Sequence, residues 1–161
     1  MAAELKISPR LEELGAICNA GYAIGLHIRF STPTFFFQTY RREWLEYYSQ
    51  NGLVLHDPIV RWGFGTTGVI RWDALAGEDE QGVLQQAAEH GLRYGIAVAL
   101  LEHGSRTIAG FAHTDRNFTD SEVGAIRRIL SGLHEDTMKQ EQLPLVERAA
   151  LKQLSILLSQ G

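Results

Sequence analysis

The chain of 161 residues contains a single cysteine, Cys18, so no disulfide bond can form within it. A lone thiol is typical of proteins in reducing compartments, and a disulfide-stabilised secreted scaffold is excluded. The longest apolar stretch, residues 96–101, is far shorter than the roughly 20 residues that span a bilayer. Residues 1–10 lack the apolar core of a signal peptide. We therefore expect a cytoplasmic protein that makes no contact with a membrane.

An excess of basic residues is also missing. Fifteen lysines and arginines stand against 19 aspartates and glutamates, which gives a net charge of −4. Non-specific binding of nucleic acid needs a basic surface, so we expect none from this chain itself. The content of 45% hydrophobic and 21% charged residues is ordinary for a soluble globular protein. A chain of this length can bury a full core without a metal or a disulfide.

Motifs for catalysis and metal binding are scarce. The six histidines show neither zinc-finger nor H-E-x-x-H spacing, and no G-x-S-x-G nucleophile motif occurs. Residues 63–68 spell G-x-G-x-x-G, but a dinucleotide site needs this motif between a strand and a helix. Here it precedes β-branched residues, so we interpret it as a connecting loop. The sequence predicts no catalytic residues, no metal site and no cofactor.

The apolar periodicity predicts alternating helices and β-hairpins. Helices are expected over residues 4–19, 41–50, from residue 58 onward, 78–90, about 120–140 and 145–158. Strands are expected over residues 22–30, 35–40, 69–72, 94–102 and 106–113, with the first two and the last two as hairpins. Hairpins favour a mostly antiparallel sheet, and the intervening helices favour coverage of both its faces. The sequence thus predicts an α+β protein, an α/β/α sandwich.

Capping signals set several of the expected helix ends. Pro9, followed by two glutamates, is typical of a helix start. Asp57 and Pro58 fit the N-cap and the first position of another helix. Thr119 and Glu122 match a capping box before an apolar-periodic run.

A cluster of aromatic residues with one acidic residue allows two interpretations. Tyr40, Trp44 and Tyr48 stand four residues apart, and Asp57 and Trp72 follow. The simpler interpretation is a helix face that packs into the core, with Asp57 as a plain N-cap. The other is a buried pocket with converging polar tips, because a buried phenol, indole or carboxylate needs a hydrogen-bond partner. A small ligand with an amide and carbonyl groups would supply such partners.

The same residues resemble the autoinducer-binding domain of LuxR-type quorum-sensing regulators. The matching positions, in chain order, are Tyr40, Trp44, Tyr48, Gly52, Asp57-Pro58, Trp72 and the Gly-Leu-Arg-Tyr-Gly segment of residues 91–95. The resemblance covers residues 11–139. It implies an α/β/α sandwich with a five-stranded antiparallel sheet, and an N-acyl-homoserine lactone bound between the sheet and helices.

The resemblance also implies a role for each matching residue. Trp44 would donate its indole N–H to the lactone carbonyl, Asp57 would accept the amide N–H of the ligand, and Tyr40 would reach the acyl carbonyl. Trp72 would form the wall at the lactone end. The remaining expected ligand-binding residues are Phe36, Tyr48, Ile59, Val60 and Phe111. Without ligand, Asp57 would be a buried acceptor that lacks a partner, which predicts ligand-dependent folding.

Three positions depart from the family pattern. Arg41 stands where many members have proline, and Ile59 where serine or threonine is common. The strand at residues 110–112 has no hydroxyl, although members usually place one there to bind the acyl carbonyl. These changes predict a more apolar pocket, which favours a long unsubstituted or a bulky acyl group, or a different ligand.

We expect residues 1–142 to form the ligand-binding domain and residues 143–161 a helical extension or the start of a helix-turn-helix domain. DNA would be bound only through such a domain, which the chain does not contain. The leading hypothesis is a sensor that forms homodimers when it binds its autoinducer. One alternative is a truncated, ligand-independent relative that inhibits a full-length regulator by heterodimerisation. Another is a small enzyme that acts on a lactone or an acyl group.

Overall fold

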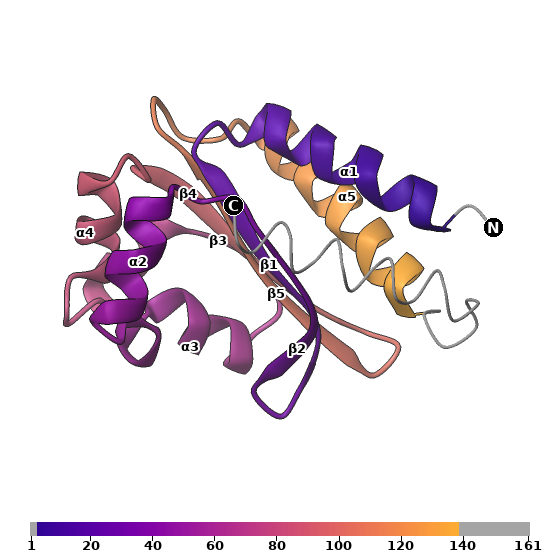
Figure 1. Ribbon diagram of the computed structural model, residues 1–161, viewed down its shortest axis with the longest axis horizontal. Helices are drawn as coiled ribbons and strands as arrows, with labels where there is room; N and C mark the ends of the chain where they lie inside the picture. Colours follow the sequence, from indigo (N-terminus) through magenta and orange to yellow (C-terminus); the bar gives the residue numbers. More distant parts are fainter. Residues whose placement is uncertain (1–2, 139–161) are drawn as a thin grey trace.

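The computed structural model describes the backbone of residues 3–138 and the side chains of residues 7–138. One antiparallel sheet lies between two layers of helices (Figure 1). The expected helix at 145–158 and the expected extension at 143–161 lie outside the described residues.

Within the described residues the sheet has five strands, and every neighbouring pair is antiparallel. The strands are β1 (Gly21–Arg29), β2 (Thr32–Gln38), β3 (Gly68–Arg71), β4 (Tyr94–Glu102) and β5 (Ser105–His113). Their order across the sheet is β2-β1-β5-β4-β3. Both predicted hairpins are present, and β1 pairs with β5 to join them into one sheet. The predicted fold class, an α+β sandwich with a five-stranded antiparallel sheet, is confirmed.

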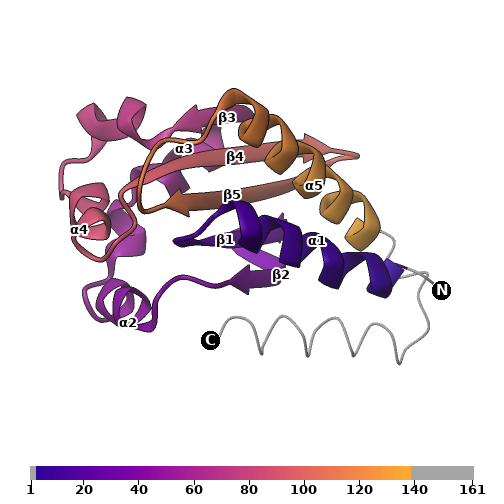
Figure 2. The ribbon, with the colours of Figure 1, turned by 90° about the horizontal axis from the view of Figure 1, so that it is seen from above.

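The helices fall into two groups on opposite faces of the sheet. Helices α1 (Ala3–Ile17) and α5 (Asp120–Met138) lie side by side on one face (Figure 2). The other face is covered by α2 (Arg42–Gln50), η1 (Leu53–His56), α3 (Pro58–Gly65), η2 (Trp72–Glu78) and α4 (Val83–Glu89). We call the two sides the α1/α5 face and the cavity face.

The predicted capping residues of α3 and α5 are confirmed. The Asp57 carboxylate accepts a hydrogen bond from the Ile59 backbone N–H at 2.9 Å, and Pro58 takes the first helical position. Thr119 and Glu122 form a reciprocal capping box, with N–H···O distances of 2.9 and 3.1 Å.

Three other sequence predictions differ from the structure. Helix α1 follows its expected range of 4–19 closely, but Pro9 lies inside the helix rather than at its start, because burial of Ile7 in the core extends the apolar stripe beyond the proline. Helix α4 begins at Val83 rather than at residue 78, since Gly82 is in the left-handed conformation and breaks the run. The expected loop at 63–68 begins inside α3, where a side chain on Gly63 would collide with Ile108 of β5. This glycine therefore serves close packing.

A buried polar network joins β1 and α5 at one end of the α1/α5 face. The pairing of β1 with β5 shifts register between Gly25 and Ile28, and His27 in this bulge has a φ of +53°. Its Nε2 lies 2.7 Å from the Thr137 hydroxyl, and its ring lies 4.4 Å from the ring of His134. Burial, together with the nearby His134 ring, lowers the pKa of His27 from 6.5 to about 4.

Candidate ligand-binding pocket

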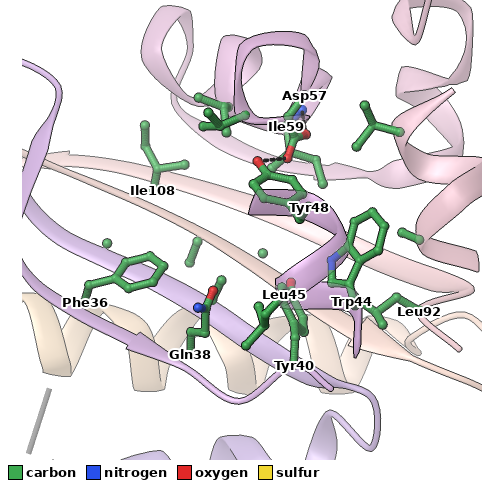
Figure 3. Close-up of a pocket in the computed structure, with 18 of the residues that line it drawn as sticks. Phe36, Gln38, Tyr40, Trp44, Leu45, Tyr48, Asp57, Ile59, Leu92 and Ile108 are labelled. Carbon is green, nitrogen blue, oxygen red and sulfur yellow. Dashed lines mark hydrogen bonds between the residues drawn. The ribbon is translucent and has the colours of Figure 1, made fainter. Parts of the chain in front are cut away.

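A cavity of about 250 Å³ lies between the cavity face of the sheet and helices α2, α3 and α4. Aliphatic and aromatic side chains dominate its lining, with a few polar tips (Figure 3). Its lining includes Ala23, Phe36, Gln38, Tyr40, Trp44, Tyr48, Asp57, Ile59, Val60, Trp72, Leu92, Ile108 and Gly110. A mostly apolar pocket with a few placed polar groups is typical of a small-molecule site.

The cavity exists because the sheet carries small residues beneath it. The register places Ala23 of β1 opposite Gly110 of β5, and Gly110 opposite Ala97 of β4. A Cβ at Gly110 would lie 3.0 Å from the Tyr40 hydroxyl oxygen. The phenol tip of Tyr40 therefore occupies the space that a side chain at position 110 would fill. This explains in physical terms why this strand has no hydroxyl-bearing residue at that position.

The indole of Trp72 packs directly on the sheet. A Cβ at Gly95 of β4 would lie only 2.3 Å from the indole ring, so this close packing requires glycine. Trp72 is 5% exposed, and its buried Nε1–H has no hydrogen-bond partner in the part of the chain that the structure describes. An unpaired buried donor costs free energy. Trp72 thus forms a closely packed part of the cavity wall, and its indole N–H is a donor that a ligand could pair with.

Asp57 has hydrogen-bond donors on both carboxylate oxygens. Besides the Ile59 N–H, it accepts a bond of 2.8 Å from the Tyr48 hydroxyl, drawn as a dashed line in Figure 3. The sequence-based expectation that Asp57 lacks a partner without ligand is therefore wrong. Tyr48 supplies the donor because η1, which packs on α2, brings the N-cap of α3 back beside Tyr48, and the sequence does not reveal this turn.

Burial dominates the electrostatics around Asp57. Loss of hydration raises the pKa of the Asp57 carboxyl, while the hydrogen bonds from Tyr48 and Ile59 oppose that rise. Burial and the nearby Asp57 carboxylate raise the pKa of Tyr48 and of Tyr40 well above their ordinary values. Both phenols therefore stay protonated and can donate hydrogen bonds.

Helix α2 holds Trp44 against the cavity. Trp44 is 4% exposed, and its ring meets Tyr48 edge-on, with 5.6 Å between the centroids. On its other side it contacts the ring of His90, at 5.2 Å. These contacts hold the indole between α2 and the end of α4, and Figure 3 shows its nitrogen on the side toward Tyr48 and Tyr40.

Eight of the nine predicted ligand-binding residues line this one cavity. They are Phe36, Tyr40, Trp44, Tyr48, Asp57, Ile59, Val60 and Trp72. The ninth, Phe111, does not line it: its ring is fully buried on the α1/α5 face, where it contacts Tyr22. Neighbouring residues of a strand point to opposite faces, so Gly110 faces the cavity and Phe111 faces away.

Sequence reasoning missed several lining residues, of which Gln38, Leu92 and Ile108 are examples. Gln38 could have been found, because Phe36, Gln38 and Tyr40 alternate along the strand predicted over residues 35–40 and would share one of its faces. Leu92 and Ile108 come from segments whose position over the cavity depends on the tertiary fold.

Comparison with known proteins identifies the family of this domain. A family model described as the autoinducer binding domain matches residues 19–135. The chain belongs to this family. It is the ligand-binding domain of LuxR-type regulators, which is a regulatory domain and not an enzyme. The small-enzyme alternative is therefore wrong. A comparison with curated protein sequences gave no match.

Solved structures share the fold at low sequence identity. The N-acylhomoserine lactone-dependent LuxR family factor CepR2 from Burkholderia cenocepacia is 19% identical, with a TM-score of 0.62 over 89% of this chain and 85% of that one. Escherichia coli SdiA in complex with octanoyl-rac-glycerol is 18% identical, with a TM-score of 0.58 over 87% of this chain and 58% of that one. The ligand-binding domain of VqsR from Pseudomonas aeruginosa is 13% identical, with a TM-score of 0.57 over 88% and 92%.

This chain thus spans less than two thirds of the length of the SdiA chain. Within residues 3–138, no helix is long and apolar enough to cross a membrane. In the same described residues, no three histidine, cysteine, aspartate or glutamate side chains form a group that could hold a metal ion.

Proposed function

We propose that this domain binds an N-acyl-homoserine lactone in the cavity between the sheet and helices α2–α4. Binding would control dimerisation and, through a helix-turn-helix domain, the binding of DNA. The observation that carries the proposal is the convergence of Tyr40, Trp44, Asp57 and Trp72 around one apolar cavity. These are the residues to which the family resemblance assigns the polar head group.

The polar tips suit the two ends of such a head group. The Trp44 indole would donate to the lactone carbonyl, and the Tyr40 phenol, held protonated by burial, would donate to the acyl carbonyl. The carboxylate of Asp57 would accept the ligand's amide N–H. The hydrogen bonds from Tyr48 and Ile59 already orient this carboxylate, so the ligand meets a pre-organised acceptor.

The volume of the cavity limits the acyl group. About 250 Å³ lies just below the range of roughly 300–1,000 Å³ that is typical of small-molecule pockets. This volume favours a short or medium acyl chain over the long or bulky one that the sequence suggested. The relative SdiA holds octanoyl-rac-glycerol, so an acylglycerol is the comparison ligand of choice.

Thermal melting of the purified chain tests the proposal. The panel contains homoserine lactones with acyl chains of increasing length, together with 1-octanoyl-rac-glycerol. At 100 times its dissociation constant a ligand adds about 2.7 kcal/mol to the free energy of unfolding, which is several degrees for a domain of this size. Trp44→Phe and Asp57→Asn should each reduce the shift, since the first removes the indole N–H donor together with part of the ring and the second replaces one carboxylate acceptor by an amide donor of the same shape.

The exposed acid Asp73 supplies a matched control, because Asp73→Asn should leave the shift unchanged. A shift for the acylglycerol and for no lactone would replace the proposed ligand class. No shift with any compound, from a folded protein, would overturn the proposal and favour the ligand-independent heterodimerisation alternative. Sedimentation of the chain with and without the bound lactone tests whether ligand promotes dimers.

A further inference from the structure

Gln38 places a side-chain amide in the part of the cavity wall that β2 forms, next to the apolar ring of Phe36. Along β2, Phe35 and Phe37 are buried on the α1/α5 face, whereas Phe36 and Gln38 line the cavity. Figure 3 shows the Gln38 amide pointing toward the cavity between Phe36 and Tyr40. No other amide side chain lines the cavity in the described part of the chain.

The residues beside Gln38 leave its amide free space. The register sets Gln38 opposite Ala23, and Ala23 opposite Gly110. Neighbouring strands lie about 4.8 Å apart, so the long glutamine side chain can lie over Ala23, whose methyl group does not obstruct it. The Tyr40 hydroxyl lies beyond, above Gly110. Among the residues that the structure describes, no side chain forms a hydrogen bond with this amide.

The position of Gln38 along the strand relates it to one part of the ligand. Phe36 and Gln38 lie about 6.6 Å apart along β2, and Tyr40 follows two residues after the end of this strand. Tyr40 lies on the side of Trp44, and Phe36 lies toward the far end of the cavity (Figure 3). A ligand whose acyl carbonyl meets Tyr40 therefore passes Gln38 with the first carbons of its chain.

Because the Gln38 amide is polar, the affinity for a ligand should depend on the substituents that these first carbons carry. A ligand methylene next to the Gln38 amide would strip its water without replacing the hydrogen bond, which is unfavourable. An oxo group could accept a bond from the Nε2–H, and a hydroxyl group could donate to Oε1 or accept from Nε2.

We propose that Gln38 is a specificity residue that makes this cavity prefer acyl chains with an oxo or hydroxyl group on the β-carbon, two bonds from the amide carbonyl carbon, over unsubstituted chains. In an acyl-homoserine lactone that position is the third carbon of the chain. The proposal rests on the proposed function. In this proposal, Gln38 of β2 supplies the polar contact with the acyl chain that position 110 cannot make, because the sequence lacks the expected hydroxyl there.

Calorimetric titration of the 161-residue chain tests this with three lactones of equal chain length: unsubstituted, 3-oxo and 3-hydroxy. The wild type should bind both substituted lactones roughly three- to tenfold more tightly than the unsubstituted one, the effect of one net hydrogen bond. Gln38→Met, of similar length and apolar, should abolish that ratio while it keeps or improves the affinity for the unsubstituted lactone. Gln50→Met, at an exposed position of α2, should retain the ratio.

A second variant separates donor from acceptor. In Gln38→Glu an ionised carboxylate can only accept, so the 3-oxo preference should be lost and the 3-hydroxy preference kept. Melting without ligand verifies that each variant is folded. A wild type without a preference, or a preference that survives Gln38→Met, overturns the inference, while binding of the unsubstituted lactone still supports the proposed function. Absence of binding by all three lactones overturns the proposed function, and the inference with it.

Discussion

The two faces of the sheet come from the same strands but carry side chains of opposite size. On the α1/α5 face, Phe35, Phe37 and Phe111 are at most 1% exposed and pack with the aliphatic residues of both helices. On the cavity face, the corresponding central positions are Ala23 and Gly110. The first face is filled by the protein itself, whereas the second leaves space beneath α2, α3 and α4.

This difference separates the two tasks of the domain. Close packing of large apolar side chains is the main source of stability, so the α1/α5 face carries the fold. A cavity forgoes dispersion contacts on its lining, so the other face is less stable until something fills it. A ligand that fills the cavity would therefore stabilise the domain through the face that contributes least by itself.

The largest expected effect tests the packing of the α1/α5 face. Phe111→Ala should lower the free energy of unfolding by about 3–5 kcal/mol, because the fully buried ring leaves a cavity that its neighbours fill only in part. Urea denaturation followed by tryptophan fluorescence measures this loss. Phe36→Ala is the matched control on the cavity face and should cost less than half as much, since the half-buried ring already borders open space. Equal losses at the two positions would contradict the division of tasks.

The next effect comes from overfilling the cavity face. Gly95→Ala should destabilise the domain by about 1–3 kcal/mol, because the added methyl group cannot coexist with the Trp72 indole in its present position. Near-ultraviolet circular dichroism should also change as Trp72 moves. The control is Gly124→Ala in α5, where a Cβ meets no atom and alanine should stabilise the helix by up to about 1 kcal/mol. A neutral Gly95→Ala would show that Trp72 does not depend on this glycine.

The sequence predicted the local features of both faces well. The hairpins, the Asp57 N-cap and the Thr119 capping box depend on neighbouring residues, which a pattern reveals directly. The family resemblance brought eight lining residues together for the same reason, since it matches positions along the chain. The resemblance could not reveal toward which face of the sheet each side chain points. Gly110 and Phe111 are adjacent, and a shift of one residue along a strand exchanges the faces.

Tertiary packing accounts for the other misses. Tyr48 reaches Asp57 only because the turn through η1 returns the chain to α2, and no spacing rule predicts this hydrogen bond. Helix α1 continues through Pro9 because burial of Ile7 outweighs the local penalty for proline. In both cases a contact distant from the local pattern decides the structure.

A smaller effect tests the polar part of the cavity. Tyr48→Phe should cost about 1–2 kcal/mol, because one oxygen of the buried Asp57 carboxylate loses its donor. It should also raise the pKa of Asp57 further, since that hydrogen bond holds the pKa down. Tyr47→Phe is the matched control: the Tyr47 hydroxyl bonds to Gln86 at an exposed site and should cost less than about 0.5 kcal/mol. Similar losses in the two variants would mean that Tyr48 does not support the carboxylate.

The smallest expected effect concerns the buried polar network of His27 at one end of the α1/α5 face. The pKa of His27 is lowered from 6.5 to about 4, so the folded state binds this proton less readily than the unfolded state. The stability that depends on neutral His27 is therefore complete above pH 6.5 and is lost as the pH falls from 6.5 toward 4. Between pH 7 and pH 5 we expect a loss of about 1 kcal/mol, after allowance for screening by solvent.

His27→Asn retains a residue that tolerates a positive φ and should remove this part of the pH dependence, whereas His56→Gln at an exposed site should retain it. If His27→Asn and the wild type lose stability in parallel as the pH falls, protonation of His27 does not oppose folding, and the network joining β1 to α5 tolerates a charge.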